Sequence, residues 1–468
     1  MLPGRVIVLD VGKTLAKLSL WSEEGRVIEQ HERYNARVES GGRQALDTEG
    51  IERWVEQILR HFARRGPVSA IVPVAHGAAA AVLRAGRLAC PVADYEDPVP
   101  QDVRAAYDAQ RDAFVLTGSP ALPDGLNLGV QLYRLEQEQP GLLTGDACIV
   151  TWPQYWAWRL SAVAASEVSS LGCHTDLWRP GEGGPSAIAR ERGWFARLAP
   201  LRRADQRLGS LSDEWAARTG LSAQVGIYCG VHDSNAALLA ARGFTDTAAA
   251  ELTVISTGTW FVAMRWPPAG AAADWAALPE SRDCLVNVDV EGRPIPSARF
   301  MGGRELERIG GLQAADSHAA VQALPEVLET GAMALPGWVP GVGPYGQSRA
   351  RWLHEPRNPA ARAAAVGLYA ALMMDTSLEL IGSSGSLIVE GRFAGTDLFV
   401  RALAALRADA QVLVNGDEES AVPYGALRLL DPTVRPPGAL RRIAPLEADL
   451  TPYKARWREA AEQRECAA

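Results

Sequence analysis

Cysteine is scarce in this chain, and the few cysteines form no recognisable pair. Six of them are spread over 468 residues, at Cys90, Cys148, Cys173, Cys229, Cys284 and Cys466, and no C-x-x-C motif joins any two. A domain held together by disulfides would show a closely spaced framework of cysteines instead. The spacing indicates reduced, mostly buried thiols, and we expect a cytoplasmic protein.

The sequence also lacks a long basic run and a long uncharged apolar run. Its 47 lysines and arginines are outnumbered by 55 aspartates and glutamates, for a net charge of −8, and the arginines stand among carboxylates, as in RRADQR and RPGEGG. This pattern argues against a nucleic acid or an anionic membrane as partner. The opening MLPGRVIVLD reaches an aspartate after one short apolar run, which predicts neither a secretory signal nor a membrane span. We expect small molecules as partners.

The chain is long enough for two domains, and 47% of its residues are hydrophobic. Alternation of apolar and polar residues predicts a three-strand meander over 5–34, and an apolar stripe predicts a helix over 48–64. Further expected elements are a strand at 68–76, helices at 127–138 and from 151, a strand, turn and helix within 218–242, a helix at 359–381, a strand at 386–390, a helix at 395–408, a strand at 411–414 and a helix at 424–430. We place the domains at 1–244 and 245–445, followed by a polar tail at 446–468.

Two segments look like distant copies of one structural motif: RVIVLDVGKTLAKLSLW at 5–21 and ELTVISTGTWFVAMRW at 251–266. Each has an apolar β-branched run, a turn rich in glycine and hydroxyl groups, and a second strand-like run. A dinucleotide fold needs a helix directly after its glycines, so a strand that doubles back argues against that fold. Two such turns facing each other across a cleft are suited to holding the phosphates of ATP through backbone N–H groups.

The first turn carries groups suited to a metal and a phosphate. Asp10 ends a strand, and its carboxylate can hold Mg²⁺ or the waters of Mg²⁺, while the metal bridges to phosphates. Gly12 allows close backbone approach, Thr14 offers a hydroxyl, and Lys13 or Lys17 can balance phosphate charge. The alternative is an ordinary Asp-Gly hairpin turn.

The second turn, Ser256-Thr257-Gly258-Thr259, offers three hydroxyls and a glycine. Taken alone it is better explained as a polar turn whose side chains satisfy their own backbone. Its equivalent place in the second half of the chain favours a phosphate-binding role.

The segment Gly230-Val231-His232-Asp233-Ser234-Asn235 lies where a strand ends and a helix begins. Asp233 can take a proton from an attacking hydroxyl, and a helix N-terminus favours negative charge nearby. Asp233 can also be a simple helix cap, and both roles are compatible. We expect His232 to pack beside it rather than to act as a nucleophile.

Several further residues have two explanations each. His76 and Gly77 end a buried strand and either face a ligand or are structural. Tryptophans 152, 156 and 158 can stack on a sugar or form core.

Asp94, Tyr95 and Asp97 form a polar loop that binds hydroxyls or is solvated. Gly391, between Glu390 and Arg392, either lets adenine approach or makes a common β–α turn. Cys173-His174-Thr175-Asp176 lacks partners at zinc spacing, so we exclude zinc there.

In combination these motifs resemble those of the FGGY carbohydrate kinases, of the actin/hexokinase/Hsp70 ATPase superfamily, over nearly the whole length. Asp10-Val-Gly-Lys-Thr14 looks like the first phosphate motif, Gly230-Val-His-Asp233 like the segment of the catalytic base, and Ser256-Thr-Gly-Thr-Trp260 like the second phosphate motif. LTGSPALPDGLN, LEQEQP and the 359–381 helix also have the look of the family. The usual Gly-Gly pair of the adenosine segment is replaced by Glu390-Gly391-Arg392.

The resemblance implies an α/β fold with two RNase H-like (actin-like ATPase) domains, each a mixed β-sheet flanked by helices, and a cleft between them. It implies that Asp233 deprotonates a sugar hydroxyl that attacks ATP, and that Asp10, with Asp233, holds Mg²⁺. Thr14, Gly258 and Thr259 would bind phosphate. Adenine would lie near Gly391, Arg392 and the 415–421 loop, and the sugar near His76, Gly77 and Trp152.

The DVGKT, DYEDP and CHTDLW segments look most like bacterial members that act on L-rhamnulose or L-fuculose. Kinases of xylulose, ribulose, glycerol or erythritol type, and a catalytically silent sugar-binding protein, are the alternatives. The expected partners are a sugar and ATP, with a homodimer left open, and neither nucleic acid nor membrane.

Overall fold

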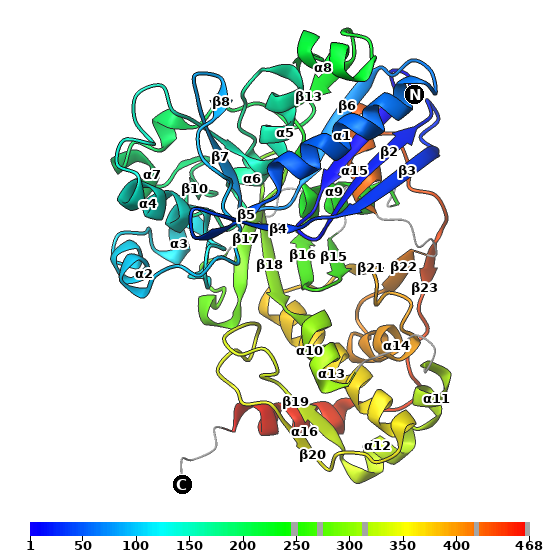
Figure 1. The fold of residues 1–468 in the computed structure, drawn as a ribbon. Coiled ribbons are helices and arrows are strands. Elements are labelled where there is room, and N and C mark those ends of the chain that lie inside the picture. Colours follow the sequence, from blue (N-terminus) through cyan, green and yellow to red (C-terminus); the bar gives the residue numbers. More distant parts are fainter. Residues whose placement is uncertain (245–250, 269–274, 311–316, 416–420, 464–468) are drawn as a thin grey trace. The chain divides into compact units, whose positions relative to one another are not determined.

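The computed structural model describes residues 1–244, 251–268, 275–310, 317–415 and 421–463 (Figure 1). The chain separates into two compact units. Unit 1 comprises Met1–Asp246, Val286–Pro294 and Ala421–Pro436, and unit 2 comprises Thr247–Leu285, Ile295–Ser420 and Pro437–Ala468. The expected boundary between 244 and 245 borders residues that lie outside the described ranges, and the division into 1–244, 245–445 and a tail stays a prediction.

Unit 1 is built on a mixed seven-stranded sheet with the order β12-β13-β6-β1-β2-β3, in which β14 also pairs with β6. The strands are β1 (Val6–Val11), β2 (Leu15–Trp21), β3 (Val27–Tyr34), β6 (Ala70–Ala75), β12 (Arg207–Ser210), β13 (Gly226–Tyr228) and β14 (Val231–His232). Antiparallel pairing of β1 with β2 and of β2 with β3 confirms the predicted meander, while β1 and β6 are parallel. The central strand β1 thus has a hairpin partner on one side and a parallel partner on the other.

Alternate residues of β1 serve two different cores, because successive side chains of a strand point to opposite faces of the sheet. Ile7 and Leu9 are fully buried in a cluster that includes residues of α1 (Thr48–Ala63) and α5 (Trp152–Ser161). Val6 and Val8 belong to another cluster, with residues of α9 (Asp233–Ala241) and α15 (Ala421–Leu430). The sheet of unit 1 is therefore covered by helices on both faces.

The other described elements of unit 1 lie beyond this sheet. Three smaller sheets pair β4 (Arg37–Ser40) with β5 (Arg43–Leu46), β7 (Ala80–Arg84) with β8 (Arg87–Leu88) and β9 (Cys148–Thr151), and β10 (Trp178–Arg179) with β11 (Gly184–Pro185). The helices are α2 (Gln101–Asp108), α3 (Phe114–Thr117), α4 (Leu128–Glu138), α6 (Val168–Leu171), α7 (Ala187–Glu191), the 3-10 helix η1 (Phe195–Arg197) and α8 (Asp213–Thr219).

Unit 2 repeats the central pairing of unit 1. Its seven-stranded sheet has the order β17-β18-β16-β15-β21-β22-β23. The strands are β15 (Leu252–Thr257), β16 (Phe261–Trp266), β17 (Cys284–Val288), β18 (Pro294–Phe300), β21 (Ser386–Gly391), β22 (Val412–Asn415) and β23 (Leu440–Arg442). β15 has an antiparallel hairpin partner, β16, and a parallel partner, β21, as β1 has in β2 and β6. The mixed sheets flanked by helices that the sequence predicted are confirmed.

The longest helix of unit 2, α13 (Pro359–Leu380), is a core helix. It is the one described helix long and apolar enough to cross a membrane, but 83% of its most apolar window is buried inside the protein. The other elements of unit 2 are the 3-10 helix η2 (Glu280–Arg282), α10 (Gly302–Ile309), α11 (Ser317–Gln322), α12 (Leu324–Thr330), β19 (Met333–Leu335), β20 (Arg351–Leu353), α14 (Asp397–Leu406) and α16 (Thr451–Glu462).

Within the segment expected as a polar tail, α16 is an ordered helix. Trp457 is fully buried and donates its Nε1–H to the carbonyl of Ala334 at 2.8 Å. Lys454 and Arg458, on the same helix, reach the buried carboxylate of Asp375 at 2.7 and 3.3 Å. The aromatic anchors are surrounded by charged neighbours in the sequence, so the pattern alone did not predict that this segment packs.

Candidate active site

Asp233 stands at the first residue of α9, directly after β14, where β14 runs parallel to β6. Gly230 precedes this turn with a φ of +81°, and a Cβ there would lie 2.2 Å from the carbonyl oxygen of Pro73, so only glycine fits. Oδ1 of Asp233 accepts a hydrogen bond from the backbone N–H of Ser234 at 2.6 Å and lies 3.5 Å from Nε2 of His232. The carboxylate is held by one oxygen at a helix N-terminus and is 31% exposed.

Asp10 lies close enough to Asp233 for their charges to interact. It is 9% exposed, in the parallel pair of β1 with β6. Burial, and then the charge of Asp233, raise the pKa of Asp10 to about 7, while Lys17 acts in the opposite direction. A buried carboxylate beside a second carboxylate offers the oxygen donors that a divalent cation takes. The donor set therefore fits the Mg²⁺ expected at Asp10 and Asp233.

The first hairpin is closed by its own backbone and by Asn35, which the sequence pattern did not single out. Gly12 donates its N–H to the carbonyl of Leu15 at 3.0 Å, and a Cβ at Gly12 would come within 2.8 Å of that oxygen. Asn35 donates its side-chain N–H to the carbonyl of Gly12 and its backbone N–H to that of Thr14, each at 2.8 Å. Thr14 is exposed at the tip of this fixed turn.

The two lysines expected to balance phosphate charge are both paired with carboxylates. Lys13 forms an ion pair with Asp94, and its ammonium group lies 5.0 Å from the ring centre of Tyr95. Lys17 pairs with Glu32 at 3.2 Å. Asp94 is 1% exposed, so the structure contradicts the alternative that its loop is merely solvated. The lysine charges are thus already balanced by carboxylates of unit 1.

His76 lies near Asp233, and both residues lie in unit 1. It is 6% exposed, and burial lowers its pKa to about 4, so the ring is neutral near pH 7. Nδ1 donates to the carbonyl of Gly77 at 2.7 Å, which leaves Nε2 as an acceptor. Trp152, expected as a stacking surface for a sugar, is fully buried against Tyr155, with its ring centre 6.3 Å from that of His76. The ring of Trp152 packs near the imidazole of His76 and is not accessible to solvent.

A buried cluster of titratable groups beside Asp233 was not predicted as a unit. Burial acts to lower the pKa of His232, but Cys173 and Asp233 outweigh it and raise that pKa to about 9. Burial acts to raise the pKa of Cys173, but His174 and His232 lower it to about 5. These opposite shifts favour the charged forms of Cys173 and His232 beside the carboxylate of Asp233. These partners lie far apart in sequence, so no local motif could have joined them.

Gly77 packs closely against both His232 and Cys173 of this cluster. A Cβ at Gly77 would lie 2.7 Å from Nε2 of His232 and 3.4 Å from Sγ of Cys173. The next residue, Ala78, has a φ of +54°, which L-residues rarely adopt and which is frequent at functional sites. The backbone after β6 is thus shaped to lie against the ring of His232.

In unit 2 the residues expected to bind phosphate and adenine meet at one end of the β15–β21 pair, where Thr257 is opposite Gly391. Gly391 has a φ of +86°, and a Cβ there would lie 2.3 Å from the carbonyl oxygen of Thr257. The hydroxyl of Thr257 donates to the carbonyl of Glu390 at 2.6 Å and accepts from the N–H of Phe393 at 3.1 Å. It is therefore used to fix the turn, whereas Thr259 is exposed at the hairpin tip.

Two neighbours complete this end of unit 2. Gly303, in the first turn of α10, packs so closely that a Cβ would lie 2.2 Å from the carbonyl oxygen of Gly258. Arg392 is 70% exposed and pairs only at 3.7 Å with Glu307. Residues 416–420 of the loop expected near adenine lie outside the described residues. Gly258, Thr259, Gly391 and Arg392 thus lie at the same end of the sheet of unit 2.

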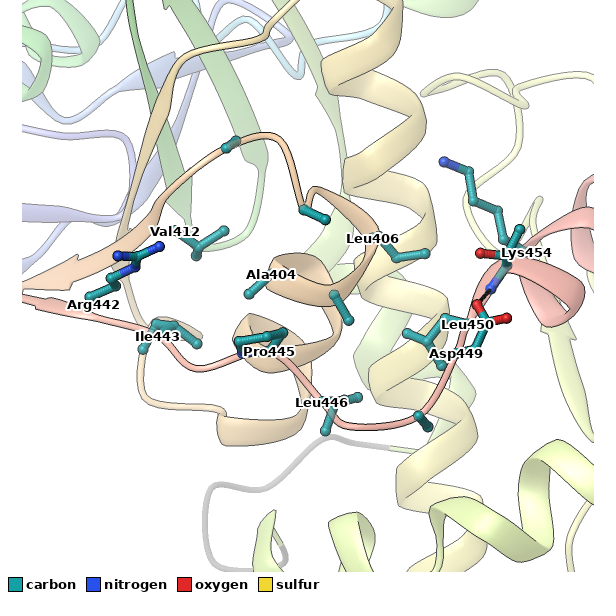
Figure 2. Close-up of a pocket in the computed structure, with 15 residues that line it drawn as sticks. Ala404, Leu406, Val412, Arg442, Ile443, Pro445, Leu446, Asp449, Leu450 and Lys454 are labelled. Carbon is teal, nitrogen blue, oxygen red and sulfur yellow. Dashed lines mark hydrogen bonds between the residues drawn. The ribbon is translucent and has the colours of Figure 1, made fainter.

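A pocket of about 480 Å³ elsewhere in unit 2 contains none of the predicted site residues (Figure 2). Its wall is mainly alanine and leucine from α14 and from the segment leading to α16, with Arg442, Asp449 and Lys454 at its edge. Lys454 is already paired with Asp375 and Glu379. Since it holds none of the predicted site residues, the pocket is not the candidate site.

Comparisons with known proteins agree on one family. A family model for the carbohydrate kinase FGGY C-terminal domain matches residues 249–437. The crystal structure of a carbohydrate kinase from Novosphingobium aromaticivorans is 50% identical, covers 97% of this chain and 100% of its own, and has a TM-score of 0.91. Glycerol kinase from Plasmodium falciparum with ADP is 13% identical, covers 99% of each chain and has a TM-score of 0.80.

Xylulose kinase from Lactobacillus acidophilus, also 13% identical, covers 97% of this chain and 96% of its own with a TM-score of 0.78. At such identities the likeness shows the fold alone. No curated protein matches the chain. The relative at 50% identity does more, because its similarity extends over nearly the full length of both proteins. The chain therefore belongs to the FGGY family of carbohydrate kinases, with their two-domain actin-like fold, and is a sugar kinase that transfers a phosphoryl group to an alcohol.

Proposed function

We propose that the protein transfers the γ-phosphoryl group of ATP to a hydroxyl of a ketose, with L-rhamnulose and L-fuculose as the first candidates. The observation that carries the proposal is the carboxylate of Asp233 at the start of α9, beside Asp10 and His76. ATP as the donor is supported by the ADP in the glycerol kinase that shares the fold. Ketoses are supported by the xylulose kinases among the solved structures of this fold.

Asp233 is the proposed catalytic base. Its Oδ1 is held by Ser234 and His232, so Oδ2 is the oxygen available to a substrate within the described part of the chain. As the sugar oxygen forms its bond to the γ-phosphorus, the hydroxyl proton moves to Oδ2, and the bond from phosphorus to the ADP oxygen breaks. His232 acts as a positioning residue, because its imidazolium fixes the carboxylate by the other oxygen.

Asp10 and Asp233 would hold Mg²⁺ by their carboxylate oxygens. When bound, the ion neutralises charge on the phosphates during transfer. Asp10 is placed for this by the end of β1, where burial and the nearby charge of Asp233 raise its pKa.

The phosphates are proposed to contact the two hairpins. In unit 1 these groups are the hydroxyl of Thr14 and the tight turn that Gly12 shapes, and in unit 2 they are Gly258 and Thr259. Lys13 and Lys17 are proposed to contribute only a general positive charge, since each is paired with a carboxylate. Thr257 is proposed to contribute by fixing the shape of the turn, because its hydroxyl is engaged with Glu390 and Phe393.

Adenine is proposed to lie along Gly391 and Arg392. Gly391 lets the backbone turn tightly against Thr257 at this point. The guanidinium of Arg392 is exposed, 5.3 Å from the ring centre of Phe393, and offers a flat cationic group to the adenine. The sugar is proposed to lie against His76 and Gly77 in unit 1. Nε2 of His76 would accept a hydrogen bond from a sugar hydroxyl, while Trp152 holds the imidazole from behind.

The test is an assay of ADP release with the purified full-length chain, ATP and Mg²⁺. The acceptors are L-rhamnulose, L-fuculose, L-ribulose and D-xylulose, with glycerol and gluconate added because kinases of both share the fold. We expect one ketose to be turned over well above the others. Preference for a polyol or an aldonate would overturn the ketose assignment, and silence with every acceptor would favour a sugar-binding protein without activity.

Asp233→Asn tests the base directly. It keeps the size of the side chain and the hydrogen bond from Ser234 but cannot take the proton. We expect sugar-dependent ADP release to fall by about 10²–10⁴-fold, with ATP binding by calorimetry retained. Asp213→Asn is the matched control, because Asp213 also begins a helix, α8, but is exposed. Near-normal turnover in Asp233→Asn would refute the assignment.

A further inference from the structure

Two histidines and a glutamate converge on one point of unit 1, at the edge strand of its sheet. Glu29 and His31 lie on β3, and His61 lies in the last turn of α1. Nε2 of His31 lies 2.8 Å from Oε1 of Glu29, and Nε2 of His61 lies 2.7 Å from the same oxygen. The three ligand atoms all lie within 4.8 Å of one another. Each imidazole therefore directs the same nitrogen at a shared centre.

The strand and the helix impose this convergence. Residues two apart on a strand point to the same face, and along β3 the residues 29, 31 and 33 are half-buried while their neighbours 28, 30, 32 and 34 are exposed. Glu29 and His31 therefore face α1 together. The two imidazole rings meet edge to face at 5.3 Å with an angle of 76° between their planes, and both pack near the buried ring of Phe62.

A fourth residue orients the carboxylate from outside. Nε of Arg65 donates to Oε2 of Glu29 at 2.9 Å, which turns Oε1 toward the two histidines. The carboxylate of Glu29 thus has an outer partner that orients it, as the carboxylates of metal sites have.

We propose that Glu29, His31 and His61 form a binding site for Zn²⁺. Two imidazole nitrogens and one carboxylate oxygen are a donor set that zinc takes, with a fourth tetrahedral position left for water. Metal–ligand bonds of about 2.0–2.1 Å in a tetrahedron separate the ligand atoms by about 3.3 Å, so each contact opens by about half an ångström. The side chains are 21–34% exposed, which gives them room for this movement. Bound zinc would join the edge strand β3 to the end of α1.

The test uses the full-length protein stripped of metal and titrated with Zn²⁺ by calorimetry, in excess Mg²⁺ so that magnesium competes at Asp10 and Asp233. We expect one tight zinc equivalent per chain and a rise in the melting temperature with zinc. His31→Gln and His61→Gln keep an N–H donor toward Glu29 but remove the imidazole ligand. Each should weaken zinc binding by more than about 100-fold, because even an outer partner is worth about 10–100-fold.

Two further variants separate this site from adventitious binding. Arg65→Gln removes only the outer partner and should weaken zinc binding by about 10–100-fold. His318→Gln, at an exposed histidine of α11 in unit 2, should change nothing. Zinc affinity that is the same in wild type and in the His31→Gln/His61→Gln double variant would overturn the proposal. The proposal would also be overturned if His318→Gln lost as much zinc affinity as His31→Gln or His61→Gln. None of these readouts depends on kinase activity.

Discussion

Gly77 is among the most constrained single residues near Asp233, because a side chain there would enter the space of His232. Gly77→Ala adds one methyl group 2.7 Å from Nε2 of that histidine, whose side chain is buried. We expect the imidazole to move and to release its hold on the carboxylate. Displacing a catalytic group by about 1 Å can cost about 100-fold, so kcat should fall by that order.

The measurement for Gly77→Ala is kcat and KM in the ADP-release assay, together with urea unfolding. Overpacking should cost about 1–3 kcal/mol of stability, which leaves the protein folded. Gly184→Ala is the control, since the nearest atom to its Cβ would be 3.9 Å away. If kcat were unchanged in Gly77→Ala, the positioning role of His232 would be wrong.

The sequence pattern found Asp10 and Asp233 because each stands where a strand ends in a turn, and such positions are visible locally. It did not find the partners that fix their surroundings. Asp94 neutralises Lys13 although the two residues are far apart in the sequence. Cys173 and His232 interact although they too are far apart in the sequence. Contacts of this sort depend on how strands and loops are brought together, which the local pattern does not encode.

At the scale of elements, α9 owes its position to its packing on α15. A Cβ on Gly425 would lie 1.8 Å from the carbonyl oxygen of Ala236, so the backbones of the two helices are in direct contact there. Gly425→Ala must push α15 away from α9, which begins with Asp233. We expect a loss of about 1–3 kcal/mol in urea unfolding together with a lower kcat. A variant as stable and as active as Gly184→Ala would contradict this.

Helix α10 is joined to α13 by a buried hydrogen bond that makes stability depend on pH. The hydroxyl of Tyr369 donates to Oε2 of Glu305 at 2.8 Å, and burial raises the pKa of Glu305 to about 7. Between about pH 4.5 and 7 the folded protein keeps a proton that the unfolded chain has lost. The free energy of unfolding therefore falls as the pH rises through this window, and low pH favours the fold at this position.

Glu305→Gln keeps the acceptor for Tyr369 and removes the charge. We expect it to flatten this part of the pH dependence and to stabilise unit 2 above pH 7, by up to about 3 kcal/mol. Urea unfolding at about pH 5 and about pH 8 measures both effects. Glu307→Gln, on the same helix but 58% exposed, serves as the control and should leave the curve unchanged.

Most of the expected helices and strands formed close to their predicted bounds, because long periodic segments such as α1 and α13 carry their own signal. The failure was α16, where Tyr453 and Trp457 bind a surface made by distant residues. A helix whose residues are mostly charged is expected to be exposed to solvent, unless the surface on which it packs is already known. That surface exists only after unit 2 has folded.

At the scale of the whole molecule, neither compact unit is a continuous stretch of sequence. Unit 1 takes α15 from Ala421–Pro436, and there the ring of Tyr424 meets Trp21 at 4.9 Å while Leu427 is fully buried. A fragment of residues 1–244 would therefore leave part of its sheet without a cover. We expect it to lack a cooperative unfolding transition and to be cut by protease far faster than the full chain.

The comparison is made by circular dichroism and limited proteolysis on the fragment and on the intact protein. A fragment that unfolds as one cooperative body with the stability of the full chain would show that α15 is dispensable for unit 1. In that case the division at 244/245 would be a true domain boundary. Addition of the 421–436 peptide should restore protection if the missing helix is the cause.

The late position of α15 also bears on how the protein is made. A ribosome releases the N-terminus first, so β1 and α9 emerge long before the helix that covers them. During that interval the apolar surface around Ala236 stays open to water and to other nascent chains. Biogenesis of this enzyme is therefore most exposed to aggregation, and most in need of a chaperone, while the second half is still being translated.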